Sequence, residues 1–398
     1  VGLELTHARS KTEDQILLVA TPASLGFSEQ WQNAGTLQNR TWELALNLPI
    51  MNRREFSWSM RGTWDRNRTH VSELFVPEFL FGGGTNQGSG GFFRITDSAQ
   101  YRLPDFGPNS PNSGRSLTNG FDANRYGNIW GRKFYRNCGD LPGAALQAQC
   151  GDGRAFQVND QGYVVWVGAG NSWREGITKN LWQTILPGSL SPWGDFVPLY
   201  WGMPIIDRPL RGEPNEGAGI RQVLGNVFPD FRFSVSNNMQ YKRLTLYALL
   251  DATIGHDVFN QGEQWGLFDF NSANFDNVGR TVETAKPLGY GWRTGPSEAA
   301  GIGGFYDVLG ANNYSVEDAS FAKIRELSLT YRVGPVRGVG DWTVGFVGRN
   351  LFTFTNYSGY DPEVGVSGGS TGSGLINQVD AFDFPTLRTY TMSLSTRF

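Results

Sequence analysis

The last eleven residues of the chain, Arg388-Thr-Tyr-Thr-Met-Ser-Leu-Ser-Thr-Arg-Phe398, alternate between apolar and polar side chains. Apart from Thr396, the residues of even number from 390 onward are apolar: Tyr390, Met392, Leu394 and Phe398. Side chains on a strand point alternately to opposite faces of a sheet, so this segment predicts a strand with one apolar and one polar face. Such a strand, ending on an aromatic residue, is typical of the last strand of an outer-membrane β-barrel.

The same alternation recurs upstream and gives eight segments in all. The predicted strands lie near 1–9, 36–48, 54–68, 231–241, 243–255, 321–333, 341–355 and 387–398. Short predicted connections near 49–53, 240–243 and 334–340 alternate with long ones near 21–35, 69–230, 255–320 and 355–385. Antiparallel barrel hairpins have short turns at the periplasmic end and longer loops outside, with 69–230 as the large extracellular loop here. The fold class is therefore all-β, an antiparallel transmembrane barrel portion.

The composition fits this class and excludes others. Glycine makes up 52 of 398 residues and aromatic residues 14%, which is typical of long, packed loops. The net charge of −3 and the absence of a basic run argue against nucleic acid as a partner. The sequence contains no apolar run of about 18 residues, so no transmembrane helix is expected, but barrel strands need only about 9–11 residues.

Cys138 and Cys150 are the only cysteines and lie in a glycine-rich stretch. In an oxidising compartment they would form a local disulfide, which stabilises a folded protein by roughly 3 kcal/mol on the chain-entropy model. The alternative is two free thiols in a loop. Without neighbouring histidines they are poor zinc ligands.

Catalytic and metal-binding patterns are weak. His7, His70 and His256 are scattered, and neither a Ser/His/Asp arrangement nor an HExxH motif is present, so we do not expect an enzyme. No cofactor is expected either, although one loop carries oxygen ligands that suit Ca²⁺: Asp269, Asn271, Asn274 and Asp276. Their spacing does not fit an EF-hand, and an ordinary Asn-rich turn is the alternative.

Tryptophans are frequent in the predicted loops, where a solvated linker would not carry them. Those with a candidate role in stacking on a substrate or gripping a partner are Trp130, Trp166, Trp173, Trp182, Trp193 and Trp201. Packing of the large loops is the alternative role for the same side chains, and the sequence leaves both open.

Two stretches, Ala319–Tyr331 and Gly348–Glu363, resemble the late barrel region of SusC/RagA-type TonB-dependent outer-membrane receptors. The matching motif residues are Asn350, Leu351, Phe352, Phe354, Asn356, Tyr357, Gly359, Tyr360, Asp361 and Pro362. The resemblance implies that the chain is the C-terminal part of a barrel of roughly 22 strands around a plugged lumen. The sequence shows no signal peptide, plug domain or TonB box, so we expect the last third or so of a receptor.

The resemblance also implies a function. Receptors of this type actively import oligosaccharides or peptides across the cell outer membrane. A SusD-like surface lipoprotein closes over their extracellular loops, and TonB acts through the N-terminal part that is missing here. The chain would supply barrel wall and loops facing the substrate and the partner. The apolar residues of the last strand would face lipid, and Tyr390, Met392, Leu394 and Phe398 would serve as an assembly signal.

Two other interpretations remain. Eight strands can close into a barrel of their own, which would make the chain a self-contained surface-binding or adhesion protein. A secreted β-sandwich that binds or cleaves glycans is the third hypothesis. Pairing between the first and the last strand would distinguish a closed small barrel from a portion of a larger one.

Overall fold

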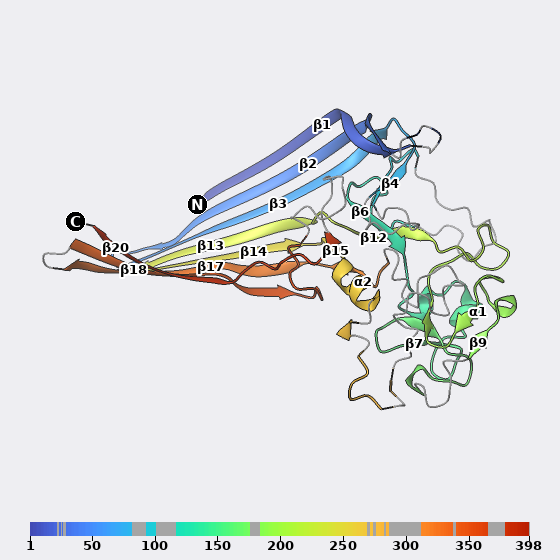
Figure 1. Cartoon of the computed structure of the whole chain (residues 1–398). Helices are drawn as coiled ribbons and strands as arrows, with labels where there is room; N and C mark the ends of the chain where they lie inside the picture. The colour runs from blue at the N-terminus through green and yellow to red at the C-terminus, as the bar shows by residue number, and fades with distance from the viewer. Residues whose placement is uncertain are drawn as a thin grey trace.

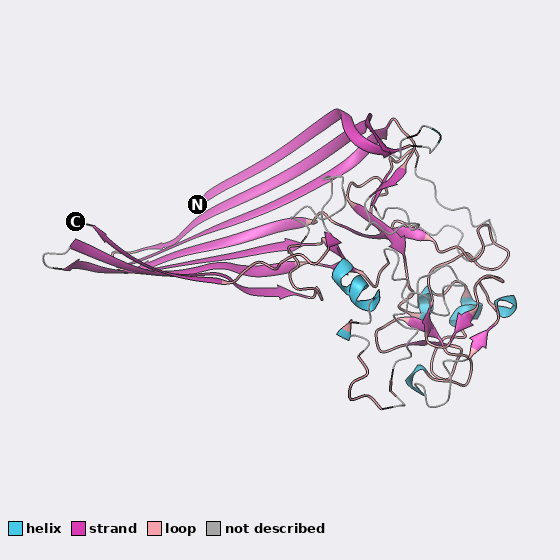
Figure 2. Ribbon diagram, in the orientation of Figure 1, coloured by secondary structure: helices cyan, strands magenta, loops and turns pink. Residues whose placement is uncertain are grey.

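One sheet of eight long strands dominates the protein (Figures 1 and 2). The computed structural model describes residues 1–21, 24, 26, 29–81, 93–100, 117–175, 184–268, 271–273, 276–281, 284–285, 312–336, 340–364 and 379–397. The long strands, in their order across the sheet, are β1 (Gly2–Ala20), β2 (Glu29–Asn52), β3 (Phe56–Leu74), β13 (Phe231–Tyr241), β14 (Leu244–Ile254), β17 (Phe321–Val336), β18 (Gly340–Thr355) and β20 (Thr389–Arg397). Every neighbouring pair is antiparallel. We call this sheet the wall.

The strand register keeps the apolar side chains of the wall on one face. Residues paired directly across antiparallel strands share a face. Leu5 pairs with Leu44, Leu44 with Trp64, and Trp64 with Phe233. The same face continues through Val344 and Leu394, which are paired at the far side of the wall. The predicted fold class, an antiparallel barrel portion, is confirmed.

The two edges of the wall are open. Within the described residues, β1 pairs only with β2, and β20 pairs only with β18. The predicted alternative of a closed eight-stranded barrel is therefore wrong, because its first and last strands would have to pair. Figure 2 shows the wall as a single layer, which also contradicts the two packed sheets of a β-sandwich.

The first three strands are longer than the sequence predicts. The region 21–35 was expected to be a loop, but β1 continues to Ala20 and β2 begins at Glu29. The register shifts between Thr12 and Gln15, where Asp14 has a φ of 52°, so a bulge breaks the alternation while strand pairing continues. Strand β3 likewise continues to Leu74, so the large connection starts at 75 instead of 69.

Short elements fill the connections at one end of the wall, which we call the loop end. Their strands are β4 (Phe79–Phe81), β5 (Phe93–Ile95), β6 (Asn128–Arg132), β7 (Phe156–Val158), β8 (Val164–Trp166), β9 (Ile185–Leu186), β10 (Leu199–Tyr200), β11 (Met203–Pro204), β12 (Arg221–Asn226), β15 (Asp257–Asn260), β16 (Val316–Asp318) and β19 (Val379–Asp380). The helices are α1 (Ala144–Gln147) and α2 (Gln261–Phe268), with 3₁₀ turns at Cys138–Asp140, Trp173–Glu175 and Gly188–Leu190. No helix in the described ranges is long and apolar enough to span a membrane.

The hydrophobic core of the protein lies in these connections. The largest cluster of buried side chains comes from the described part of residues 117–226, which we call the loop body, and includes Phe134, Phe156, Trp193 and Ile206. We call the end of the wall that carries the short turns the turn end. Figure 1 shows the loop body at the opposite end of the molecule. The molecule therefore combines a one-layer wall with a packed body at its loop end.

Candidate functional site

The polar face of the wall is the surface that would line a barrel interior. Thr63 Oγ1 lies 2.7 Å from Ser234 Oγ, and Arg232 Nε lies 3.5 Å from Asp65 Oδ2. Hydrogen bonds and ion pairs thus join β3 to β13 across this face. Polar groups at this density belong in water or against other polar groups, since burying them unpaired in lipid is costly.

A network of charged side chains is buried on this face near the loop end. The side chain of Lys323 is 1% exposed, and its Nζ donates hydrogen bonds to Asp361 Oδ1 at 2.6 Å and Glu363 Oε2 at 2.8 Å. Arg325 Nη1 donates to Glu363 Oε2 at 2.6 Å, and Arg325 Nη2 donates to Asp251 Oδ2 at 2.8 Å. The network fixes the segment that follows β18 against the polar face of β14 and β17.

Two carboxylates of this network, Glu363 and Asp361, have pKa values below the usual range. Burial alone would raise the pKa of Glu363, but hydrogen bonds from Arg325 and Lys323 outweigh burial and lower it. Burial likewise opposes ionisation of Asp361, and hydrogen bonds from Lys323 and Thr386 leave its pKa below the usual value. The Thr386 N–H donates to Asp361 Oδ2 at 2.8 Å, so Asp361 also holds the chain as it approaches β20.

The motif predicted from Asn350 to Pro362 is split between two roles. Phe352 and Phe354 lie on the exposed apolar face of the wall. Tyr357 is buried, and its hydroxyl donates to Asp380 Oδ2 at 2.7 Å. A Cβ on Gly359 would lie 2.4 Å from the Tyr357 ring, so only glycine fits there.

The other motif residues surround these. Asn350 has a φ of 52° and its Nδ2 donates to Leu387 O at 3.0 Å, while Leu351 is buried. Asn356 and Tyr360 are exposed, and Pro362 is buried beside Asp361. The motif therefore supports the link from β18 to β20. Sequence reasoning found Asp361 but missed its partner Lys323, which lies between the apolar residues Ala322 and Ile324.

A half-buried carboxylate joins two loop sheets. Asp257 Oδ2 accepts a hydrogen bond from the Asn226 N–H at 2.8 Å, which links β15 to β12. Gly225 permits this approach, since a Cβ there would lie 2.3 Å from Asp257 Oδ2. Burial raises the pKa of Asp257 to about 7, against the pull of the Asn226 hydrogen bond. Its charge therefore changes near neutral pH.

Four of the tryptophans with a predicted role in ligand contact are buried in the cores of the loop body and its neighbours. Trp130, Trp166, Trp193 and Trp201 are at most 5% exposed. Protein covers these four side chains, which favours packing, one of the two roles that the sequence left open.

The remaining two tryptophans differ. Trp173 is half-buried, packs against the cluster of Val165, Val167 and Trp201, and has the Arg174 guanidinium 5.0 Å from its ring centre. Trp182 lies outside the described residues.

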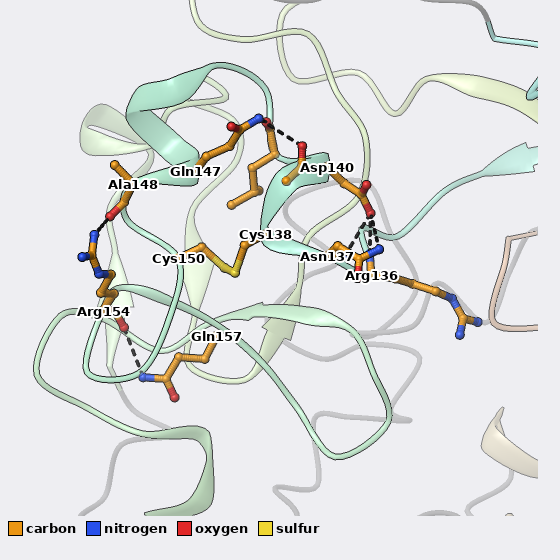
Figure 3. The surroundings of a disulfide bond; sticks show 11 residues. Arg136, Asn137, Cys138, Asp140, Gln147, Ala148, Cys150, Arg154 and Gln157 are labelled. Carbon is orange, nitrogen blue, oxygen red and sulfur yellow. Dashed lines mark hydrogen bonds between the residues drawn. A yellow bond between two sulfur atoms is a disulfide. The ribbon is translucent and has the colours of Figure 1, made fainter.

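The predicted disulfide between Cys138 and Cys150 is present (Figure 3). It joins the turn at Cys138–Asp140 to the segment after α1, where Gln147 Nε2 donates to Leu141 O at 2.9 Å. Asp140 Oδ2 accepts the Asn137 N–H at 3.0 Å. The disulfide therefore links the two segments that flank Leu141 and Leu146, which belong to the buried core of the loop body.

The structure describes only part of the residues considered for calcium and for catalysis. Asp269 and Asn274 lie outside the described residues, Asp276 Oδ1 accepts the Val278 N–H at 2.8 Å, and Asn271 lies in a turn. In the described ranges no group of three or more His, Cys, Asp or Glu side chains is placed to hold a metal. His256 is buried, which lowers its pKa, and its Nε2 lies 3.4 Å from Pro362 O.

The residues predicted as an assembly signal lie on the outer strand of the wall. Tyr390, Met392 and Leu394 are 62%, 79% and 65% exposed on the apolar face. Phe398 lies outside the described residues. A row of large apolar side chains this exposed to water would be unusual for a soluble protein of one layer.

Comparison with known proteins agrees with this geometry. The chain is 23% identical over 405 residues to TonB-dependent receptor P3 of Formosa agariphila, a match that covers 100% of the chain and 32% of that receptor. It is 25% identical over 411 residues to TonB-dependent receptor P39 of the same organism, covering 97% of the chain and 33% of the receptor. The chain is a relative of the TonB-dependent receptors. No protein-family model matches it.

Solved structures show the same fold. The RagAB peptide transporter matches with a TM-score of 0.53 and 15% identity over 98% of the chain and 33% of the transporter chain. The RagAB peptide importer in its open-open state matches with a TM-score of 0.57 and 15% identity, over 100% of the chain and 32% of the importer chain. This TonB-dependent receptor relative thus has the fold of a part of such transporters, and it spans about a third of the length of the curated relatives it matches.

Proposed function

We propose that this chain is the wall and loop layer of a SusC-like receptor that actively imports oligosaccharides or peptides across the cell outer membrane. The observation that carries the proposal is the open sheet with a continuous apolar face opposite a polar face. A face of this kind is stable against lipid, and open edges are satisfied by further strands of the same barrel. In this orientation the loop end faces outside and the turn end faces the periplasm.

The loop layer supports a role in substrate and partner contact. The loop body has its own buried core and a disulfide, so it presents a shaped surface above the wall. The ion network of Lys323, Asp361 and Glu363 fixes the base of another connection. We propose that these loops contact substrate and a SusD-like surface lipoprotein, while TonB acts through a part of the receptor outside this chain.

The proposed activity is binding and gated passage, without bond making. The relatives are named receptors, and the matching structures are named peptide transporters or importers. Peptides and oligosaccharides are therefore the two substrate classes to test.

Uptake by cells tests the proposal. We would disrupt the receptor gene, restore it on a plasmid, and measure uptake of labelled peptide and oligosaccharide mixtures with and without a proton-gradient uncoupler. The expected result is uncoupler-sensitive uptake of one substrate class that disappears on disruption and returns on restoration. Unchanged uptake of both classes, or recovery of the receptor in the soluble fraction, would contradict the proposal.

A further inference from the structure

A cavity of 390 Å³ lies at the turn end of the wall, away from the loops that the proposed function uses. It is formed where the β13–β14 hairpin lies beside the last residues of β17, which contribute Gly334 and Pro335 to its lining. Its lining includes the cationic side chains of Lys242, Arg243 and Arg332, together with the polar residues Gln240 and Thr330.

Backbone contacts fix the turn beside this cavity and hold one of its cations. Lys242 has a φ of 52° in the two-residue turn, and its N–H donates to Glu55 O at 2.8 Å. Arg243 Nη1 donates to Val333 O at 2.7 Å. A Cβ on Gly334 would lie 3.2 Å from Arg243 Nη1, so the glycine lets the guanidinium lie close to the backbone. The Arg243 guanidinium is therefore placed before any ligand arrives.

Their charges are only partly neutralised. Lys242 Nζ lies 3.3 Å from Glu55 Oε2, and Arg332 Nη2 lies 3.1 Å from Asp341 Oδ2. Arg243 makes no ion pair within the described part of the chain. Three cations thus face two carboxylates, and an arginine has five N–H donors, of which one is used by Val333 O. The cavity retains capacity for an oxyanion.

We propose that this cavity binds carboxylate side chains of an acidic polypeptide segment that approaches the turn end of the wall. Gln240, Thr245 and Thr330 line the cavity and share the polar face of the wall. Their neighbours Tyr241, Leu244 and Tyr331 form the apolar face. The cavity therefore opens toward the interior of the proposed barrel, where polypeptide can reach it, and not toward lipid headgroups.

The inference rests on the proposed orientation of the wall, and cross-linking in native outer membranes tests it separately from transport. A water-soluble carbodiimide joins a lysine amine to a carboxylate in contact with it, and mass spectrometry identifies the partner. We expect Lys242 to be joined to Asp or Glu residues outside residues 1–398. The Glu55→Gln variant, which removes the internal competitor, should raise the yield.

Two variants test whether the external cross-links of Lys242 depend on the arginines of the cavity. Replacing both arginines (Arg243→Gln with Arg332→Gln) should lower the external cross-links of Lys242 about fivefold or more, because two charge-assisted contacts are lost. Arg61→Gln, which removes one charge elsewhere on the polar face, should leave them unchanged. Cross-links of Lys11 to Glu13, an exposed ion pair on β1, serve as the internal yield reference.

Three outcomes would overturn the inference. The first is that Lys242 is joined to Glu55 alone in the wild type and to nothing in Glu55→Gln. The second is an external yield that the double arginine variant does not change. The third is co-purification of anionic phospholipid that depends on Arg243 and Arg332 without any external peptide cross-link. Loss of import with cross-links intact would contradict the proposed function and leave this inference standing.

Discussion

The wall and the loop body treat apolar side chains in opposite ways. On the wall, Met392 and Leu394 are 79% and 65% exposed, whereas Trp193 and Trp201 of the loop body are each 1% exposed. The loop body hides its apolar groups from water within itself, as soluble domains do. No second layer of the described chain covers the outer face of the wall, which is the arrangement expected for a face that meets an apolar medium. One chain therefore contains parts built for two solvents.

The largest predicted effect is on the packed side of this comparison. Trp201→Ala should destabilise the loop body by about 3–5 kcal/mol, because it leaves a cavity in a closed core. We expect the loop body to become protease-sensitive while the wall keeps its heat-modifiable mobility on SDS gels. Phe196→Ala, at an 84% exposed site in the same body, is the matched control and should change little. A wall that unfolds together with the loop body would contradict this separation.

A charge on the lipid-facing side should break the wall. Phe346→Arg should destabilise the assembled barrel by up to about 4 kcal/mol, because the charge would face hydrocarbon. The adjacent Val347 lies on the polar face, paired with Ser328 and Thr391, so Val347→Arg is the control and should assemble almost normally. Assembly is measured as the heat-modifiable fraction in isolated outer membranes. Equal effects of the two variants would mean that the faces do not meet different media.

Loss of the disulfide should act on the loop body alone. Replacing both cysteines by serine should lower its stability by roughly 3 kcal/mol, because the unfolded chain regains the freedom of the closed loop. Protease resistance of the loop body, measured with and without reducing agent, reports the change. The wild type under reducing conditions should match the variant, and a variant as resistant as the oxidised wild type would contradict the prediction.

The last prediction concerns pH and a single junction between two loop sheets. The folded pKa of Asp257 is raised to about 7 from 3.8, so the folded state binds this proton more tightly than the unfolded state. Its contribution to stability is therefore full at low pH and is lost as pH rises from about 4 to 7, with a slope of at most about 1.4 kcal/mol per pH unit. Asp257→Asn should remove this slope and stabilise the junction of β12 and β15 at pH 8. Hydrogen exchange of the Asn226 amide, corrected for its intrinsic rate, measures it, and an unchanged pH profile would refute it.

The sequence predicted the wall well because period-two alternation is a direct consequence of strand geometry. It failed where bulges shift the parity, as at Asp14, since pairing continues there without a regular pattern. The strands of the loop body have two to six residues, too few for any periodicity to show. Which face of a loop tryptophan is covered depends on residues far away in the chain, so the sequence could not separate packing from ligand contact.

The candidate site was only partly predictable for a similar reason. The cysteine pair is local and was found. Lys323 and Asp361 are 38 residues apart, and only the fold brings them within hydrogen-bonding distance. The basic cavity at the turn end combines the β13–β14 hairpin with the last residues of β17, and no motif in either segment indicates it.

The hydrogen bonds of Asp361 have a consequence for how such a receptor can change its substrates. Asp361 binds Lys323 in the wall and the Thr386 backbone near the start of β20, so both ends of the intervening connection are held at one point. For a loop held at its base, each doubling of length costs only roughly 0.6 kcal/mol in closure entropy. New sequence can therefore be inserted there over evolution without altering the wall beneath it.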